Sequence, residues 1–494
     1  MARKPDILIF NPDQFRADAL AHLGCEGSIT PYLDQTCETD GVSFSNAYCQ
    51  NPVCTPSRCS FMTGWYPHVH GHRTMHYMLH PDEPMLLRTL KENGYFVWWG
   101  GKNDVIPGQF GHEAFCDVYN KPKREITGYG LHGHTQWRGH PDGDNYYSFL
   151  AGKVEPREGK DTYVDDDWAQ VLDAIDFIKS YDGDKPLCVY LPILYPHPPY
   201  GVEEPYYSSI DRSKVKPPVK PYKNWEDKPS LLKGIWEGQR MQGWSEERMV
   251  DLKATYLGMC ARVDTQYGML LDTLRETGRY DDTAVFFFSD HGDFTGDYGL
   301  VEKTQNTFQD CLVRVPFLIK PPRSVPVQPR ISDAMVELVD FSATVAELAD
   351  IDLGHTAFGR TLVPLLEGRE TEHRDAVFCE GGRMKDEWHC KEYQSIQLAG
   401  PTGLYMPRVS LQQRDGPEHT KAIMIRTKQW KYVYRVYEKH ELYDLENDPN
   451  ETENRIDDPA AAEVLASLKL RMLQYFVETA DVVPYKEDER NFRS

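Results

Sequence analysis

The chain has no run of about 18 consecutive apolar residues, the length that a membrane-spanning helix requires. Of its 494 residues, 40% are hydrophobic and 27% are charged, and the mean hydropathy is −0.59. Ala2-Arg3-Lys4 is followed only by a brief apolar run before Asn11, which is too short for the core of a signal peptide. We therefore expect a soluble protein that stays in the cytoplasm and has no membrane partner.

Paired cysteines and an excess of positive charge are also missing. The 11 cysteines are odd in number and scattered, without metal-ligand spacing, so they do not indicate a disulfide framework. The 76 acidic residues outnumber the 55 lysines and arginines, which gives a net charge of −21. Because nucleic-acid binding depends on basic surfaces, no nucleic-acid partner is expected.

Alternation of two hydrophobic patterns predicts the fold class. Residues 167–178 have apolar side chains at helical spacing, and residues 187–194 form a short apolar run typical of a buried strand. Such alternation predicts an α/β protein with a large mixed or mostly parallel sheet sandwiched by helices. Segments 110–165 and 200–245 are rich in Gly, Pro and aromatic residues, so we predict long loops above the strand ends, where selectivity would reside.

A smaller unit is predicted at the C-terminus, with a boundary near residue 375. Short strand-like runs at 422–426, 430–434 and 441–445 are joined by turns. The apolar residues of the last helical pattern are Val464, Leu468, Met472 and Phe476. The prediction is an α/β domain over 1–375 and, over 376–494, a small antiparallel sheet plus a helix.

Three short segments, residues 13–14, 54–67 and 290–291, carry candidate chemistry. Residues 54–58 read Cys-Thr-Pro-Ser-Arg, and residues 62–67 read Met-Thr-Gly-Trp-Tyr-Pro. Asp13 and Gln14 end the apolar run 7–10, and Asp290 and His291 follow the apolar run 284–288. Functional groups of open α/β sheets gather at the carboxyl ends of strands, so both pairs are predicted to form one site.

The donor types of this site favour a hard divalent ion. Carboxylate, amide and imidazole groups suit Ca²⁺ or Mg²⁺, and the imidazole leaves room for Mn²⁺ or Zn²⁺. Taken singly, each segment has a simpler explanation. The acids could cap the following helices, and Cys54 could be a small buried hydrophobe at a Pro-Ser turn, because short motifs match by chance.

Taken in order, the three segments resemble the type I sulfatases of the alkaline phosphatase superfamily, in which this cysteine is oxidised to Cα-formylglycine. The resemblance implies an alkaline-phosphatase-like fold and the hydrolysis of a small sulfated substrate, either a sulfated carbohydrate or an aryl or alkyl sulfate. It also implies a formylglycine-generating maturation enzyme as partner. The implied ligands are Asp13, Gln14, residue 54, Asp290 and His291. Gln14 departs from the commoner Asp-Asp pair, although Asp-Gln occurs in choline-sulfatase-like and phosphonate-monoester-hydrolase-like relatives.

The same resemblance implies roles for further residues. Arg58, Lys102 and Lys303 would neutralise the sulfate oxygens, and His197 or Lys303 would protonate the leaving group. Asp104 stands where many sulfatases have a histidine, which makes it the candidate base for the second hydroxyl of the aldehyde hydrate. Taken singly, a lysine is usually a solvated surface charge, and a histidine between prolines is usually a loop residue.

Several alternatives stay open at this stage. A phosphonate monoester or phosphodiester hydrolase would use the same site, and a non-catalytic anion-binding relative is favoured if Cys54 is never oxidised and Asp104 marks a disabled site. A homo-oligomer is also compatible with the sequence. One loop is either a structured aromatic loop or a wall that recognises a sugar or aryl group. Its residues are His132, His134, Trp137, Arg138 and His140.

Overall fold

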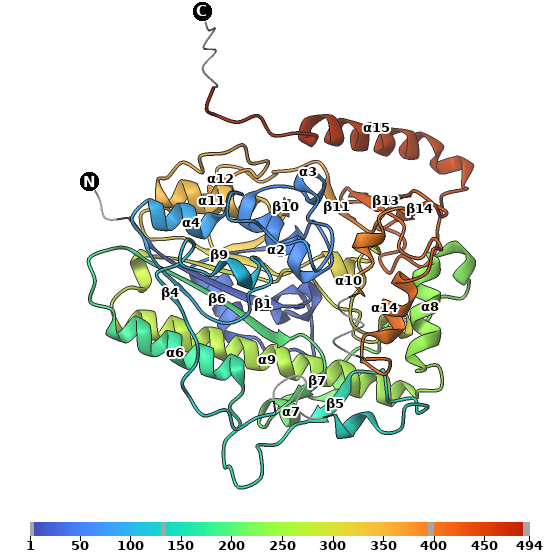
Figure 1. Ribbon diagram of the computed structural model, residues 1–494, viewed down its shortest axis with the longest axis horizontal. Helices are drawn as coiled ribbons and strands as arrows, with labels where there is room; N and C mark the ends of the chain where they lie inside the picture. Colours follow the sequence, from blue (N-terminus) through green and yellow to red (C-terminus); the bar gives the residue numbers. More distant parts are fainter. Residues whose placement is uncertain (1–3, 130–134, 394–399, 488–494) are drawn as a thin grey trace, which may run out of the picture.

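A computed structural model of the protein describes residues 4–129, 135–393 and 400–487 (Figure 1). An 8-stranded sheet has the order β10-β2-β9-β8-β1-β6-β3-β4. Its strands are β1 Asp6–Asp13, β2 Val42–Tyr48, β3 Phe96–Trp99, β4 Val118–Tyr119, β6 Leu187–Pro196, β8 Thr283–Phe288, β9 Phe317–Lys320 and β10 Arg330–Glu337. Only β9 runs antiparallel to its neighbours β8 and β2, while the other neighbouring pairs are parallel. The predicted mixed, mostly parallel sheet is confirmed.

The central strands are apolar on both faces, which explains their unbroken hydrophobic runs. In β1, Ile7 and Ile9 belong to one buried cluster, whereas Leu8 and Phe10 belong to the cluster on the opposite face. Successive side chains of a strand point to opposite faces, so a parallel strand covered on both sides reads as a continuous apolar run. Each strand can therefore turn polar only at its end.

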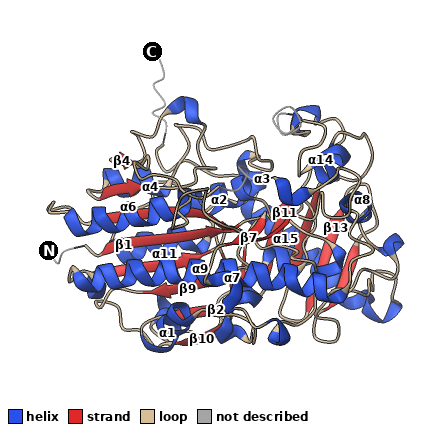
Figure 2. Cartoon of the chain, turned by 90° about the horizontal axis from the view of Figure 1, so that it is seen from below, coloured by secondary structure: helices blue, strands red, loops and turns tan. Residues whose placement is uncertain are grey.

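Helices cover both faces of the sheet (Figure 2). One face carries α1 Pro31–Thr39, α6 Asp166–Ser180 and α9 Glu246–Glu276, and the other carries α2 Cys54–Thr63, α4 Leu86–Glu92 and α11 Asp340–Ala349. The predicted amphipathic helix is α6, and Asp165 caps it by accepting a hydrogen bond from the backbone N of Trp168 at 3.0 Å. Among the described residues, no helix is long and apolar enough to cross a membrane.

A second, 4-stranded sheet has the order β11-β12-β13-β14 and is antiparallel throughout. Its strands are β11 Val377–Gly381, β12 Ala422–Arg426, β13 Trp430–Arg435 and β14 Glu441–Asp444. Helix α15, Ala462–Thr479, packs Leu468 and Met472 against Phe378 and Tyr432 of this sheet. The predicted C-terminal sheet and helix are thus confirmed, and the boundary at residue 375 stays a prediction.

One local prediction was wrong. Segment 200–245 is not only loop, since it contains β7 Tyr200–Val202, α7 Tyr206–Ser209 and α8 Ser230–Gln239. Strand β9 begins at Phe317, shortly after α10, Asp310–Val313. The described part of 110–165 is mostly loop, with β4 and with β5 Leu150–Lys153, which pairs with β7. The remaining short helices are α3 Pro67–His70, α12 Val363–Leu366 and α14 Met406–Gln412.

Candidate active site

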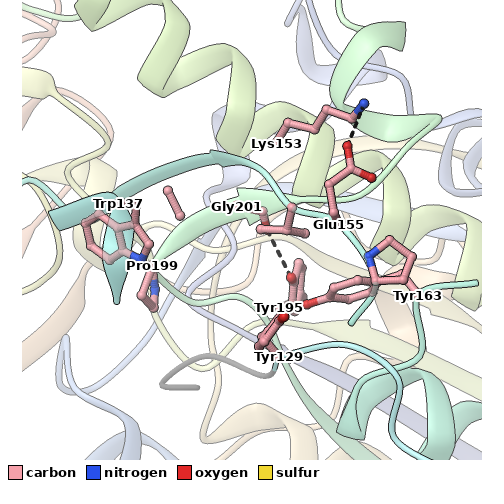
Figure 3. A pocket seen from close by; sticks show the side chains of 11 residues that line it. Tyr129, Trp137, Lys153, Glu155, Tyr163, Tyr195, Pro199 and Gly201 are labelled. Atoms are coloured by element: carbon pink, nitrogen blue, oxygen red, sulfur yellow. Dashed lines mark hydrogen bonds and ion pairs between the residues drawn. The ribbon is translucent and has the colours of Figure 1, made fainter. Parts of the chain in front are cut away.

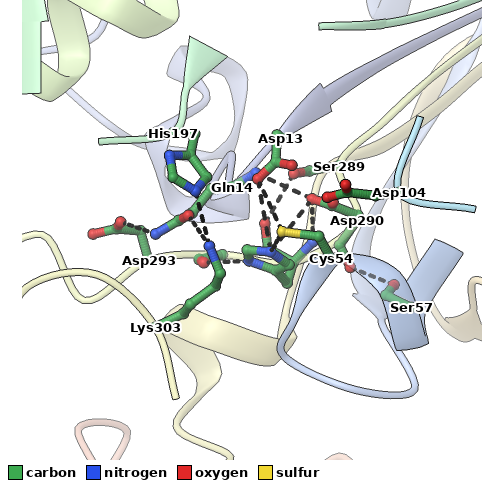
Figure 4. Close-up of polar contacts among 12 residues, drawn as sticks. Asp13, Gln14, Cys54, Ser57, Asp104, His197, Ser289, Asp290, Asp293 and Lys303 are labelled. Atoms are coloured by element: carbon green, nitrogen blue, oxygen red, sulfur yellow. Dashed lines mark hydrogen bonds and ion pairs between the residues drawn. The ribbon is translucent and has the colours of Figure 1, made fainter. Parts of the chain in front are cut away.

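Four of the five predicted metal ligands lie together at the carboxyl edge of the large sheet. Strands β1 and β8 are neighbours and run parallel, so Asp13 at the end of β1 lies beside Asp290 and His291, which follow β8. Helix α2 begins at Cys54 and brings its thiol to the same place. The ligand atoms of these four buried residues all lie within 4.8 Å of one another. Figure 4 shows Asp13, Cys54 and Asp290 converging on this point.

Arg58 holds the two carboxylates in place. Its guanidinium is 0% exposed and donates to Asp290 Oδ2 at 2.9 Å, to Asp13 Oδ2 at 3.1 Å and to Asn11 Oδ1 at 2.9 Å. The Oδ1 atom of Asp13 lies instead 3.6 Å from the Cys54 sulfur. We therefore interpret Arg58 as the residue that positions the carboxylates, and not as one of the cations that neutralise the sulfate oxygens.

His291 presents a lone pair to the cluster. Its Nδ1 lies 2.9 Å from the carbonyl oxygen of Gly292, which can only accept, so this nitrogen carries the hydrogen. Burial lowers the pKa of His291 and favours the neutral ring. Its Nε2 then lies 3.2 Å from the Cys54 sulfur and 3.7 Å from Asp13 Oδ1. A divalent cation fits this set of ligands, the carboxylates of Asp13 and Asp290 and the neutral imidazole of His291, whose other nitrogen is held by a hydrogen bond.

Gln14, the fifth predicted ligand, is engaged on the other side of Asp13. Its backbone, with φ of 70°, donates to Asp290 Oδ1 at 3.1 Å. Its amide oxygen accepts from Lys303 at 2.8 Å, and its amide nitrogen donates to Asp293. In this arrangement the Gln14 amide holds Lys303 at the end of β1. The role of Gln14 as a metal ligand stays a prediction.

Lys102 places a cation beside Cys54. Its Nζ contacts Asp13 Oδ2 at 2.5 Å, Asp104 Oδ2 at 2.9 Å and the Cys54 sulfur at 3.5 Å. Burial would lower the pKa of Lys102, but Asp104 and Asp13 raise it well above its ordinary value. Burial would likewise raise the pKa of Asp13, but Lys102 is the largest of the cationic influences that hold it well below the usual range. Asp104, the candidate base, is thus an ion-pair partner of Lys102.

Lys303 and His197 form a hydrogen-bonded pair next to the thiol. His197 Nδ1 lies 2.6 Å from the carbonyl oxygen of Pro198, and its Nε2 lies 3.0 Å from Lys303 Nζ. Burial and Lys303 lower the pKa of His197 well below its ordinary value. Burial would lower the pKa of Lys303, but Cys54 and Glu302 raise it. The proton of the pair therefore resides on Lys303, and the neutral imidazole accepts from it.

Some residues around this centre were not predicted. Asp293, at 0% exposure, accepts from Tyr200 at 2.7 Å, and burial raises its pKa to about 6. It belongs to the Asp-His-Gly-Asp run after β8, which was a usable signal. Arg408 in α14 lies 3.5 Å from Glu302, the residue before Lys303. No motif in the sequence surrounds Arg408.

Part of the loop with two possible interpretations, packed aromatic loop or recognition wall, lines a cavity of about 260 Å³ (Figure 3). Trp137 faces this cavity together with Pro199, which follows His197 by two residues. The guanidinium of Arg138 stacks 3.7 Å from the Tyr146 ring centre, so this part of the loop is packed. His140 is exposed, and His132 and His134 lie outside the described residues. The recognition role stays a prediction.

An α/β fold whose strand ends unite carboxylates, an imidazole, a thiol and cations provides the groups that hydrolysis of an anionic ester requires. The sulfatase family model matches residues 5–351, and a model described as the C-terminal part of N-sulphoglucosamine sulphohydrolase matches residues 415–478. The chain therefore belongs to the sulfatase family and is a sulfuric ester hydrolase by class. The predicted family and enzyme class are confirmed.

Named relatives agree over nearly the whole chain. A multifunctional alkaline phosphatase superfamily protein, PehA, of Trinickia caryophylli is 25% identical over 97% of this chain and 96% of its own length. A choline-sulfatase of Rhizobium meliloti is 26% identical over 99% of this chain and 90% of its own. The crystal structure of the phosphonate monoester hydrolase of Agrobacterium radiobacter matches with a TM-score of 0.74 and 22% identity, over 98% of this chain and 100% of that one. The likeness in structure confirms the fold.

Proposed function

We propose that the protein hydrolyses sulfate monoesters and releases inorganic sulfate, with a formylglycine made from Cys54 by a maturation enzyme as its nucleophile. The environment of Cys54 carries this proposal. Burial, with Asp13, raises the pKa of the thiol to about 12, so the unmodified side chain is protonated at neutral pH and is a poor nucleophile. Yet Lys102 and His291 contact its sulfur directly, as they would contact a reacting group.

Formylglycine supplies, as its hydrate, two hydroxyl groups on one carbon, one to attack sulfur and the other to expel sulfate while the aldehyde is recovered. The anionic ester would be repelled without cations in a site of low dielectric. Lys102 and Lys303 flank residue 54 and would neutralise the sulfate oxygens. Lys303, which holds the proton of its pair with His197, would donate it to the leaving oxygen.

Asp13, Asp290 and His291 would hold a divalent metal, which supplies Lewis-acid stabilisation of charge when bound. Treatment with EDTA followed by desalting is therefore expected to abolish turnover of 4-nitrophenyl sulfate, and Ca²⁺, Mg²⁺ or Mn²⁺ should restore it. Asp290→Asn should lower metal affinity, measured by calorimetry, by at least about 10–100-fold.

Asp104→Asn is the matched control for metal binding, because Asp104 pairs with Lys102 outside the four-residue cluster. Its metal affinity should stay close to that of the unchanged protein. Full turnover of a metal-free preparation would refute the metal assignment.

His197→Ala is expected to slow turnover by about 10²–10⁴, the range of a lost acid–base contribution. The imidazole orients the Lys303 ammonium at 3.0 Å, and no hydrogen bond joins it to Asp13, Asp290 or His291 within the described residues. Metal affinity should therefore survive in this variant. The measurements are kcat with 4-nitrophenyl sulfate and calorimetric titration with Ca²⁺.

His22→Ala serves as the control for this experiment, since His22 is partly buried in a polar contact, 2.7 Å from Asp34, away from the site. It should keep its turnover. A His197 variant that loses its metal along with its activity would contradict the acid–base role of His197.

A phosphonate monoester or phosphodiester hydrolase is the second candidate. It is favoured by the Asp13-Gln14 pair and by the likeness in fold to a phosphonate monoester hydrolase. A panel of 4-nitrophenyl sulfate, bis(4-nitrophenyl) phosphate and a 4-nitrophenyl phosphonate decides between the two. The sulfatase proposal requires the highest kcat/KM on a sulfate ester. Absence of turnover on all three by protein carrying formylglycine would favour the non-catalytic anion-binding alternative.

A further inference from the structure

Helix α14, which belongs to the C-terminal part of the chain, brings an arginine to the edge of the candidate active site. Arg408 is 8% exposed, and its Nε lies 3.5 Å from one oxygen of Glu302. The other oxygen of Glu302 lies 2.9 Å from Lys303 Nζ. Glu302 thus connects Arg408 to the lysine that is proposed to protonate the leaving group. Within the described residues, no hydrogen bond or ion pair joins the Arg408 guanidinium to Cys54, Asp13 or Asp290.

Close helix packing fixes the backbone that carries Arg408. Helix α14 lies against α8 (Figure 1). A Cβ atom at Gly234 of α8 would lie 2.8 Å from Leu411, and one at Gly238 would lie 3.0 Å from Pro407. These glycines therefore allow the two helices to approach closely on both sides of Arg408. A side chain held on such a rigid element can define the position of a bound group.

The guanidinium of Arg408 has fewer hydrogen-bond partners than it has donor groups. Its Nε and Nη1 atoms are buried and donate no hydrogen bond within the described chain, although the ion pair with Glu302 remains. Gln412, one helical turn later on the same face of α14 and 1% exposed, has no hydrogen bond to either amide atom from the described residues. His419, 3% exposed, likewise has no hydrogen-bond partner for either ring nitrogen among the residues that the structure describes. Buried polar groups are normally hydrogen-bonded. The unpaired polar atoms of Arg408, Gln412 and His419 therefore indicate that a polar ligand binds here.

Two further features connect this set to the reacting centre. The Tyr405 ring lies 5.7 Å from the Arg408 guanidinium and 5.4 Å from the Phe149 ring. Burial and Glu302 raise the pKa of Tyr405, while Lys303 and Lys102 act in the opposite direction. Lys102 contacts the Cys54 sulfur, and Glu302 pairs with both Lys303 and Arg408, so three cationic side chains gather around Cys54 and α14 in a chain whose net charge is −21.

We propose that Arg408 binds a second anionic group, a carboxylate or a second sulfate, on the alcohol part of the sulfate ester. The substrates are then dianions, in which the reacting sulfate lies at Cys54 and the other anion at α14. The planar fork of an arginine matches such oxyanions, and the buried setting strengthens the contact. This inference rests on the proposed sulfatase function and names its substrate class.

The test compares matched pairs of substrates. The 2-, 3- and 4-sulfooxybenzoates carry a carboxylate, and the corresponding sulfooxybenzyl alcohols carry a neutral group at the same position. We expect at least one benzoate, or the matching benzene disulfate, to exceed its neutral partner in kcat/KM by about 10-fold or more. Arg408→Gln should remove that preference, chiefly through KM, and leave 4-nitrophenyl sulfate within about 3-fold. Arg408→Lys should retain part of it.

The controls separate recognition from folding and from turnover. Arg414→Gln changes an exposed arginine just beyond α14 and should leave the preference intact. Calorimetric binding of the product hydroxybenzoates to Cys54→Ala protein needs no hydrolysis, and Arg408→Gln in that background should weaken it about 10-fold or more. Failure of hydrolysis with intact Arg408-dependent binding would overturn only the sulfatase function. Equal kcat/KM for dianions and neutral partners, or an equal loss on both in Arg408→Gln, would overturn the subsite.

Discussion

Cys54→Ala is expected to lower kcat for sulfate ester hydrolysis by about 10⁴-fold or more, the scale on which loss of a covalent nucleophile acts. The thiol lies at the start of α2, 3.2 Å from His291 Nε2 and 3.5 Å from Lys102 Nζ. No other described thiol has such neighbours. Metal affinity should fall much less, because Asp13, Asp290 and His291 remain.

The matching chemical measurement is the mass of the tryptic peptide that ends at Arg58. It should be about 18 Da lighter than calculated for cysteine, a change distinct from the usual oxidation ladder. Cys59→Ala is the control, since Cys59 is equally buried in the same helix but belongs to the apolar core. It should keep both the mass change and turnover. Turnover by protein whose Cys54 is wholly unmodified would contradict the formylglycine proposal.

The sequence allowed the prediction of those site residues that end buried strands. An apolar run covered on both faces must stay hydrophobic along its length, as in residues 7–10 and 284–288, so the first acid marks the strand end. Strands β1 and β8 are parallel neighbours, and this pairing brings Asp13 and Asp290 together. Fold class, strand ends and the cluster of four ligands were therefore accessible to reasoning from pattern and resemblance.

The features that were missed depend on contacts between distant segments. An apolar run does not encode strand direction, so the antiparallel course of β9 could not be predicted. Helix α8 has Leu231, Leu232 and Ile235 at helical spacing, but the proline- and glycine-rich surroundings obscured them. Arg408 lies 105 residues after Lys303, on a helix with no motif, and only packing of α14 against α8 brings it to the site. Pattern alone cannot supply such a contact.

Arg58→Ala is the second change with a large expected effect, and it should affect both stability and function. The guanidinium lies between Asp13 and Asp290, which are both 0% exposed. Removing one member of a buried ionic network leaves uncompensated charge, which typically costs about 3–5 kcal/mol in the free energy of unfolding. Thermal unfolding should show this loss. Ca²⁺ should recover part of the stability, because it would neutralise the same carboxylates and bind the folded state.

Arg374→Ala is the matched control for this prediction. Arg374 also bridges two buried carboxylates, donating to Asp340 Oδ2 at 3.0 Å and pairing with Glu337 at 3.0 Å, but it lies outside the site. Both variants should lose stability to a similar extent. Only Arg58→Ala should lose turnover and metal affinity at temperatures well below its unfolding transition, because only in this variant do the freed carboxylates face the reacting group.

Arg58→Lys should recover part of the stability but little turnover, since a single ammonium cannot reproduce the planar guanidinium that aligns both acids. If Arg374→Ala lost turnover equally, the effect of Arg58 would be one of stability alone, and its assignment as the residue that positions the metal ligands would fail.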